Sequence, residues 1–242
     1  MTPDESHWRS LLARPPDLSP ASADAWFAGI ATRLLNGCRL RAGGGTYRFT
    51  EVEAYYHGPG HADPFTHRDP LQTETGRWYF HRTAGVYRSG SFKGVDITFG
   101  DGAAFGGMLV RGIEREDGLL VDGPSLTVDH LLAATGTETV GELDRAIANR
   151  PAWDAGSPLH VDWADPPADR EVVRCGRVGI TLRRARSAAA TRFVMMPYRF
   201  LTEPRRIAKG KPLTVVGLYE AGATDPPALA ARTGSPKGTI GR

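Results

Sequence analysis

The sequence has few cysteines, no long apolar run and little net charge. Two cysteines among 242 residues are too few for a disulfide framework, and their spacing offers no zinc-binding pair. No apolar stretch approaches the roughly 20 residues of a transmembrane helix, and the N-terminus lacks the apolar core of a signal peptide. We therefore expect a cytoplasmic protein with free thiols at Cys38 and Cys175 and no membrane partner.

Length and composition fit one globular domain. Hydrophobic residues make up 40% of the chain and charged residues 24%, which is ordinary for a protein with a single core. Residues 1–20 are rich in proline, aspartate and serine, and we expect an irregular leader there. We place the folded domain over residues 21–218 and a flexible tail over residues 219–242.

Helical and strand patterns both occur within this domain. Apolar spacing predicts a helix over 21–37 with Ser22 as its N-cap, and a shorter helix between Pro124 and Gly136. Residues 38–56 predict a strand, a glycine turn and a second strand. Further strands are expected over 76–82, 106–117 and 171–183, with short strands broken by glycines over 85–101. Residues 192–204 are either a strand or a loop, and 141–170 is expected to be irregular. The pattern is typical of the α+β class.

Two glutamates lie two residues apart on one of these strands. Glu51 and Glu53 therefore face the same side, together with Tyr55. Such a pair is either a solvated face or a site for chemistry. Arg111 lies in the middle of another apolar strand and needs a carboxylate partner if it is buried, and Glu53 is a candidate.

The loop that follows the glutamates is rich in histidine. His57, His61, Asp63 and His67 suggest a metal site, but Pro59 and Gly60 break any helix that would bring the first two together, and no HExxH motif is present. Either these residues bind a metal in a hydrolase, or each one caps a backbone group of the loop.

Basic residues are concentrated near the C-terminal end, although the net charge is only +3. Glu203 is the one acidic residue among eleven basic ones: Arg174, Arg177, Arg183, Arg184, Arg186, Arg192, Arg199, Arg205, Arg206, Lys209 and Lys211. This segment is either a solvated face or a surface that contacts phosphates, where each neutralised phosphate releases counterions.

An ordered set of segments resembles the alkyladenine (3-methyladenine) DNA glycosylase family. FTEVEAYYHGPGHADPFTH is similar to the family's Glu-Ala-Tyr strand, Gly-Pro loop and Asp-Pro-x-Ser/Thr-His. LLNGCRL, AGVYRSGSFKGVDIT, GGMLVRGIE, DGPSL, CGRVGI and MMPYRF then match family segments in the same order. The resemblance covers roughly residues 25–210.

The resemblance implies a fold and an activity. The fold would be one mixed α+β domain with a curved, mostly antiparallel, barrel-like sheet and peripheral helices. The activity would be excision of a flipped, damaged purine from DNA by a monomeric enzyme that uses no metal or cofactor. By matched position, Glu53 would activate the attacking water, and Arg111 would lie behind Glu53 and orient either Glu53 or the water. Tyr55, His67 and Tyr87 would line the base pocket and stack on the flipped base. Within the basic segment, we expect Arg177 and Arg199 to contact DNA.

Two departures from the family put its DNA chemistry in question. Asp96 replaces the pocket asparagine, and because an ionised carboxylate only accepts hydrogen bonds, we expect a preference for cationic or amino-bearing bases. The tyrosine that the family inserts into the duplex is missing from the turn around residues 88–92. Either Phe92 or Arg88 replaces it, or the substrate is single-stranded.

A rival hypothesis keeps the fold without the reaction. A nucleic-acid-binding protein would need the basic segment but not the paired Glu53 and Arg111. The presence of both favours the enzyme.

Overall fold

An antiparallel sheet forms the centre of this computed structural model, which describes residues 3–183, 185 and 187–236. Its main strands lie side by side in the order β10 (Leu159–Trp163), β1 (Cys38–Ala42), β2 (Gly45–Gly58), β8 (Phe105–Arg115), β7 (Val95–Phe99) and β4 (Thr75–Phe80). Every neighbouring pair in this order is antiparallel. The α+β class and the largely antiparallel sheet are confirmed.

Shorter strands extend this sheet at its margins. β12 (Arg199–Leu201) pairs with the middle of β2 and with β11 (Val173–Cys175), so these two C-terminal strands join the sheet beside β2. β3 (His61–Ala62) pairs with β2, and β9 (Leu120–Asp122) with β8. A separate two-stranded ribbon consists of β5 (Arg82–Thr83) and β6 (Val86–Tyr87).

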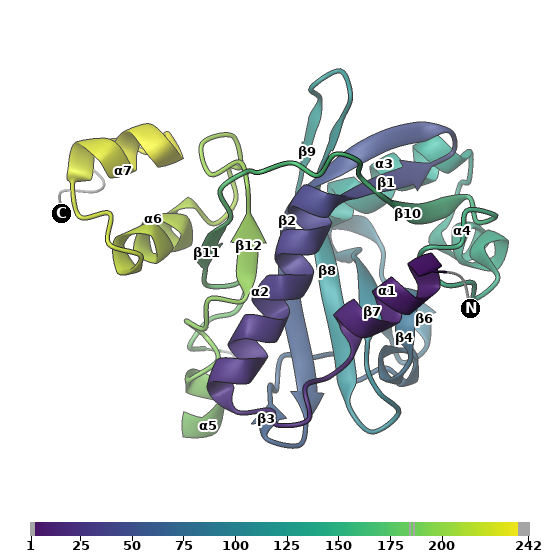
Figure 1. Cartoon of the computed structure of the whole chain (residues 1–242), viewed down its shortest axis with the longest axis horizontal. Coiled ribbons are helices and arrows are strands. Elements are labelled where there is room, and N and C mark those ends of the chain that lie inside the picture. The colour runs from purple at the N-terminus through teal and green to yellow at the C-terminus, as the bar shows by residue number, and fades with distance from the viewer. Residues whose placement is uncertain (1–2, 184, 186, 237–242) are drawn as a thin grey trace.

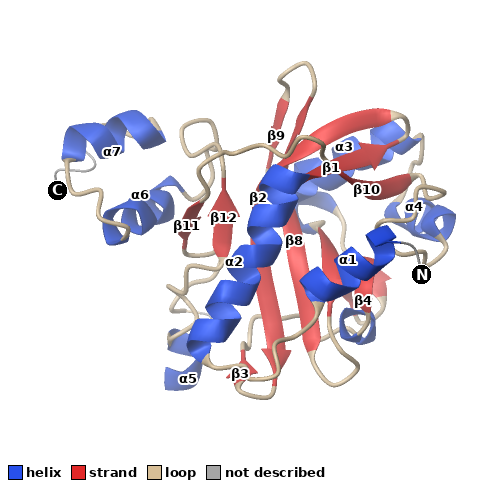
Figure 2. Cartoon of the chain, in the orientation of Figure 1, coloured by secondary structure: helices blue, strands red, loops and turns tan. Residues whose placement is uncertain are grey.

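Helices surround the sheet (Figure 2). They are α1 (Pro3–Leu12), α2 (Pro20–Gly37), α3 (Pro124–Thr135), α4 (Val140–Ile147), α5 (Ala188–Thr191), α6 (Lys211–Glu220) and α7 (Pro226–Thr233), with 3-10 turns η1 (Pro70–Thr73) and η2 (Gly90–Phe92). α2 crosses the front of the sheet in Figure 1, whereas α6 and α7 lie to one side beside β11 and β12.

The strand period of two separates the sheet into a core face and a polar face. On β2, Val52, Ala54 and Tyr56 belong to the apolar core, and Trp26 of α2 contacts the Tyr56 ring edge-on. Glu53 and Tyr55, which alternate with them, therefore point to the opposite side. Glu51 joins that side because the pairing of β2 with β8 is irregular on both sides of Glu51, which shifts the alternation after the core residue Phe49. The same alternation occurs on β8, β7 and β4, whose core residues are Met108, Val110, Val95, Ile97, Phe99, Trp78 and Phe80.

The predicted hairpin and central helix are confirmed. Gly43 and Gly44 form the turn between β1 and β2 with φ of +52° and +87°, a region that favours glycine. Pro124 begins α3, and Gly136 ends it in the left-handed conformation. The N-cap of α2 is Ser19 rather than Ser22, because the Ser19 side chain accepts the Ser22 amide and Pro20 opens the helix.

Both ends of the described chain are more ordered than the composition suggested. The expected irregular leader contains α1, whose Trp8 is 2% exposed and stacks on Trp153 and Trp163. The expected flexible tail contains α7, whose Leu229 is buried in a small second core. Residues 141–170, expected to be irregular, contain most of α4 and all of β10. In each case buried apolar side chains outweigh the local proline and polar content.

The cysteines and the helices match two expectations from the sequence, free thiols and apolar stretches shorter than a membrane span. Cys38 and Cys175 are both free and buried. None of the helices in the described residues combines the length and the apolar character that crossing a bilayer requires.

Candidate functional site

One row of side chains crosses the polar face of the sheet. Glu53 on β2 lies opposite Leu109 on β8, and Leu109 lies opposite Asp96 on β7. Asp96 in turn lies opposite Tyr79 on β4. Because directly paired residues point to the same side of a sheet, the two carboxylates face one space, with Leu109 between them.

A cavity of about 310 Å³ lies above this row. That is within the usual size range of small-molecule sites. Aromatic and imidazole rings from Tyr55, Phe65, His67 and His81 line it, together with polar or charged groups and the apolar residues Leu109, Pro124, Val178 and Ile180. The polar or charged lining comprises Gln72, Asp96, Arg88, Ser91, Lys93 and Arg111.

Glu53 is fully buried beside this cavity, and three neighbours of its carboxylate line the cavity wall. Oε1 accepts the backbone N–H of Val178 at 2.7 Å and lies 3.4 Å from Arg111 Nε. Oε2 accepts the Tyr55 hydroxyl at 2.8 Å. Burial and the Glu53 charge raise the pKa of Tyr55 well above its ordinary value, so this hydroxyl remains a donor to Glu53 at neutral pH.

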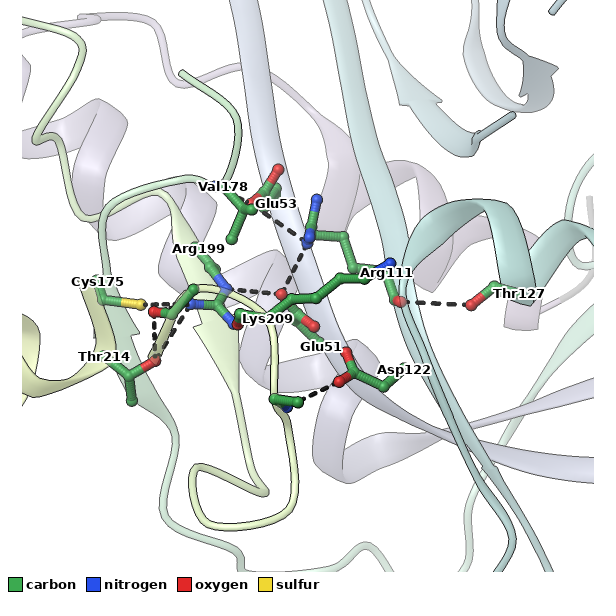
Figure 3. Close-up of polar contacts among 12 residues, drawn as sticks. Glu51, Glu53, Arg111, Asp122, Thr127, Cys175, Val178, Arg199, Lys209 and Thr214 are labelled. Atoms are coloured by element: carbon green, nitrogen blue, oxygen red, sulfur yellow. Dashed lines mark hydrogen bonds and ion pairs between the residues drawn. The ribbon is translucent and has the colours of Figure 1, made fainter. Parts of the chain in front are cut away.

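Glu53 belongs to a buried line of alternating charges (Figure 3). Arg199 donates through Nε to Glu51 Oε1 at 2.6 Å, and the same oxygen accepts Arg111 Nε at 2.7 Å. Burial acts to lower the pKa of Arg111, but the carboxylates of Glu53 and Glu51 raise it above its ordinary value. Arg111 is therefore a permanent cation between two carboxylates.

Beyond Tyr55, the line of alternating charges continues to the loop of residues 63–67 beside the cavity. Arg177 places its guanidinium 4.4 Å from the centre of the Tyr55 ring and pairs with Asp63 at 2.5 Å. It also donates to the backbone carbonyl of Ala54. Asp63 accepts the amide of Phe65, which lines the cavity. Arg177 thus joins strand β2, the 63–67 loop and the Val178 amide that binds Glu53.

A second polar cluster occupies the Asp96 end of the cavity. His81 Nε2 lies 2.8 Å from Asp96 Oδ1, and Gln72 Nε2 donates to Asp96 Oδ2 at 3.1 Å. The His67 and His81 rings meet edge-on at 4.4 Å, and His67 Nδ1 lies 3.2 Å from the Tyr79 hydroxyl. Burial, with a contribution from His81, lowers the pKa of His67 to about 4. His67 is therefore neutral at physiological pH.

The structure brings most of the expected site residues together. Tyr55, His67, Asp96 and Arg111 line the cavity, and Glu53 lies directly behind it. Arg88 and Phe92, two of the four expected DNA contacts, also line it, and Phe92 is 72% exposed.

Tyr87 was wrongly placed in the pocket. It does not line the cavity. Its hydroxyl donates to Asp144 of α4 at 2.5 Å, and the guanidinium of Arg82 lies 4.7 Å from its ring. The Tyr87 side chain on the β5–β6 ribbon therefore points toward α4, and its hydrogen bond to Asp144 connects the ribbon to that helix.

Arg177 and Arg199 were wrongly expected to contact DNA, because both are fully buried in ion pairs. Two more arginines of the basic segment are paired at partly exposed positions, Arg174 with Asp24 and Arg206 with Glu114. The segment's exposed basic residues with no ion pair in the described structure are Arg183, Arg192, Arg205 and Lys209. Arg184 and Arg186 lie outside the described residues.

The histidines of the loop act separately. His57 contacts the carbonyl of Asp63, whereas His61 is buried between the carbonyl of Tyr56 and the hydroxyl of Tyr198. Within the described ranges, no three His, Cys, Asp or Glu side chains come close enough to hold a metal ion. Only His57 contacts a backbone group of the loop, whereas His67 and Asp63 have the side chains of Tyr79 and Arg177 as partners.

Gln72 and His81 are cavity residues that the sequence did not reveal. Gln72 forms a capping box of η1 with Asp69, and this local pattern gives no indication that its side-chain amide also binds Asp96. His81 follows strand β4, and its pairing with Asp96 depends on the antiparallel register of β4 and β7. Its position one residue past an apolar strand was the available signal.

A second cavity, of about 400 Å³, lies between β11 and α6. Two of its lining acids, Asp24 and Glu171, already pair with Arg174 and Arg232. It contains none of the residues around Glu53, so the chemistry is assigned to the smaller cavity.

Comparison with known proteins finds a similar viral protein. No family model matches the sequence. The uncharacterized protein L759 of Acanthamoeba polyphaga mimivirus is 35% identical over 148 residues, which make up 55% of this chain and 68% of the viral protein. This chain belongs to the family of that protein. The viral protein's name specifies no activity, so the function follows from the site.

Removing the Arg177 side-chain charge is expected to unfold the site. Arg177→Met leaves Asp63 buried without its cation, which should lower the free energy of unfolding by about 3–5 kcal/mol. The matched variant Arg115→Met breaks the exposed Arg115–Asp117 pair and should cost at most about 1 kcal/mol. Urea denaturation of both variants measures the difference. If both variants lost equally little free energy of unfolding, Arg177 would not contribute to stability as proposed.

His67 is expected to make stability depend on pH. Its pKa is about 4 in the folded chain and roughly 6.5 when unfolded. Between these values the unfolded chain binds more protons, so the free energy of unfolding should fall as pH decreases through this window. His67→Gln should flatten this part of the profile, whereas His7→Gln, at an exposed position, should not. A His67→Gln profile with the wild-type slope would contradict the assignment.

Proposed function

We propose that this protein is a DNA glycosylase that flips a damaged purine out of DNA and hydrolyses its N-glycosidic bond. The observation that carries the proposal is the buried Glu53 carboxylate, held by two hydrogen-bond donors and the Arg111 cation directly behind the wall of a ring-lined cavity. A carboxylate so placed suits a general base whose water attacks a sugar held at the cavity mouth.

The hydrogen bonds of Glu53 leave room for that water. A carboxylate has about four acceptor positions. In the described structure Val178 uses one of them on Oε1 and Tyr55 uses one on Oε2, whereas Arg111 Nε donates to Glu51 and forms only an ion pair with Glu53, at 3.4 Å. The remaining position on Oε2 suits a water molecule. Tyr55 and Arg111 would fix the carboxylate in one orientation, which lowers the cost of reaching the reactive geometry.

The charge of Glu53 supplies a second contribution. Loss of a purine leaves positive charge on the sugar, as in other glycoside hydrolyses. A negative carboxylate in a site shielded from water stabilises that charge more strongly than it would in solvent. Arg111 lies next to Glu53 but shares its charge with Glu51. Glu53 is therefore only partly neutralised.

The cavity lining suits an extruded base. Tyr55, Phe65 and His67 present rings to it, and stacking of a base on such rings contributes about 1–3 kcal/mol. Alkylation places positive charge on a purine, which electron-rich rings also attract. It also makes the base a good leaving group, so one carboxylate is sufficient.

The rim of the cavity suits DNA. Phe92 is 72% exposed beside Arg88 and Lys93, which also line the cavity. An exposed apolar ring next to basic groups fits a wedge that enters the space left by the flipped base. Phe92 on η2 would then replace the wedge tyrosine of the alkyladenine DNA glycosylases, and the sheet would be a divergent form of their fold.

The decisive experiment measures base release from alkylated duplex DNA in the presence of a chelator. Wild-type protein should release free bases, and Glu53→Gln should be about 10²–10⁴-fold slower in a single turnover, the usual contribution of a general base. Glu116→Gln, a change at an exposed carboxylate, should keep the wild-type rate. Circular dichroism checks that each variant is folded.

Other results identify the rival functions. DNA binding without release by the wild type would indicate a non-catalytic binding protein. Release that the chelator abolishes would indicate a metal-dependent hydrolase. Equal rates for the wild type and Glu53→Gln would exclude Glu53 as the base.

A further inference from the structure

The end of the cavity opposite Glu53 presents a carboxylate held from behind by two donors. Asp96 is 2% exposed, yet it lines the cavity. A carboxylate only accepts hydrogen bonds, so His81 Nε2 donates to Oδ1 and Gln72 Nε2 donates to Oδ2. Each oxygen is thus fixed by its own protein donor.

Space for this arrangement comes from a glycine on the next strand. A Cβ atom at Gly107 would lie 2.3 Å from Asp96 Oδ2 and 2.9 Å from Gln72 Nε2. Any larger residue would displace both groups. Gly107 therefore allows the Gln72 amide to reach the Asp96 carboxylate.

The acceptor positions of Asp96 are half used. Of the roughly four positions on a carboxylate, His81 and Gln72 occupy one on each oxygen. One position on each oxygen is left. The ligand that matches two adjacent acceptors is a group with two adjacent N–H donors.

We propose that Asp96, positioned by His81 and Gln72, reads the Watson–Crick edge of a guanine-type base. Guanine carries a ring N–H and an amino group side by side on that edge. Adenine offers one amino group next to a ring acceptor, which a carboxylate repels, and hypoxanthine offers only the ring N–H. This inference rests on the proposed function, and it names N-alkylated guanine as the preferred substrate.

The binding of free bases tests the proposal without catalysis. 7-Methylguanine and 7-methylhypoxanthine differ only in the amino group, and each is titrated into the full chain by calorimetry. A hydrogen bond to a charged group corresponds to about 10- to 100-fold in affinity, so wild type should bind 7-methylguanine more tightly by that factor. Equal affinities in the wild type would overturn the proposal without any variant.

Three variants assign the preference to Asp96 and its partners. Asp96→Asn replaces one acceptor with a donor and should abolish the preference. His81→Phe keeps a ring against Gly94 but removes one positioning donor, so the preference should fall. Asp144→Asn alters a carboxylate that binds Arg82 and Tyr87 outside this cavity and should retain it. An unchanged preference in Asp96→Asn would overturn the proposal. The ratio of two affinities is not affected by a loss of folded protein.

Release from methylated DNA separates this inference from the proposed function. DNA treated with dimethyl sulfate contains 7-methylguanine and 3-methyladenine, and both released bases are quantified. Release that favours 7-methylguanine, with the bias lost in Asp96→Asn, supports both proposals. Release without such a bias keeps the glycosylase and overturns the guanine preference. Selective binding of free 7-methylguanine without any release keeps the recognition and overturns the glycosylase.

Discussion

The site depends on a buried line of alternating charges. Arg199, Glu51, Arg111 and Glu53 follow one another across the sheet, and Tyr55 connects them to the Arg177–Asp63 pair. Each ion would be costly to bury alone, but each has at least one partner of opposite charge, and Glu51 and Arg111 each have two. Since three arginines balance three carboxylates, no member can move without leaving another unpaired. This constraint orients Glu53 more firmly than a single ion pair would.

The line ties together parts of the chain that are far apart in sequence. β2 supplies the glutamates, β8 supplies Arg111 and β12 supplies Arg199, while Arg177 follows β11. Strand pairing brings Arg199 opposite Glu53 and places Leu109 between Glu53 and Asp96. The two ends of the cavity therefore have separate tasks. In the proposed function, one end would hold a carboxylate beside the sugar, and the other a carboxylate that faces the edge of the base.

Period-two alternation and glycine turns allowed the hairpin, the shared face of Glu51 and Glu53, and the helix ending at Gly136 to be predicted. Arg177 and Arg199 were misplaced because a run of arginines reads the same whether it is solvated or buried in ion pairs; only the fold reveals Asp63 and Glu51 as partners. Tyr87 was misplaced because a two-residue strand gives no period from which to deduce direction. The pairing of His81 with Asp96 depends on strand register, which local patterns do not encode.

The central claim is that Glu53 stabilises positive charge on the sugar of a flipped nucleotide. Its most direct test compares duplexes that carry either a cationic pyrrolidine or a neutral tetrahydrofuran in place of one nucleoside. Because transition-state analogues bind at least about 10²-fold more tightly than ground-state ligands, wild type should prefer the pyrrolidine duplex strongly, and Glu53→Gln should lose most of that preference. Equal affinities in wild type, or the same preference in Glu53→Gln, would contradict the account.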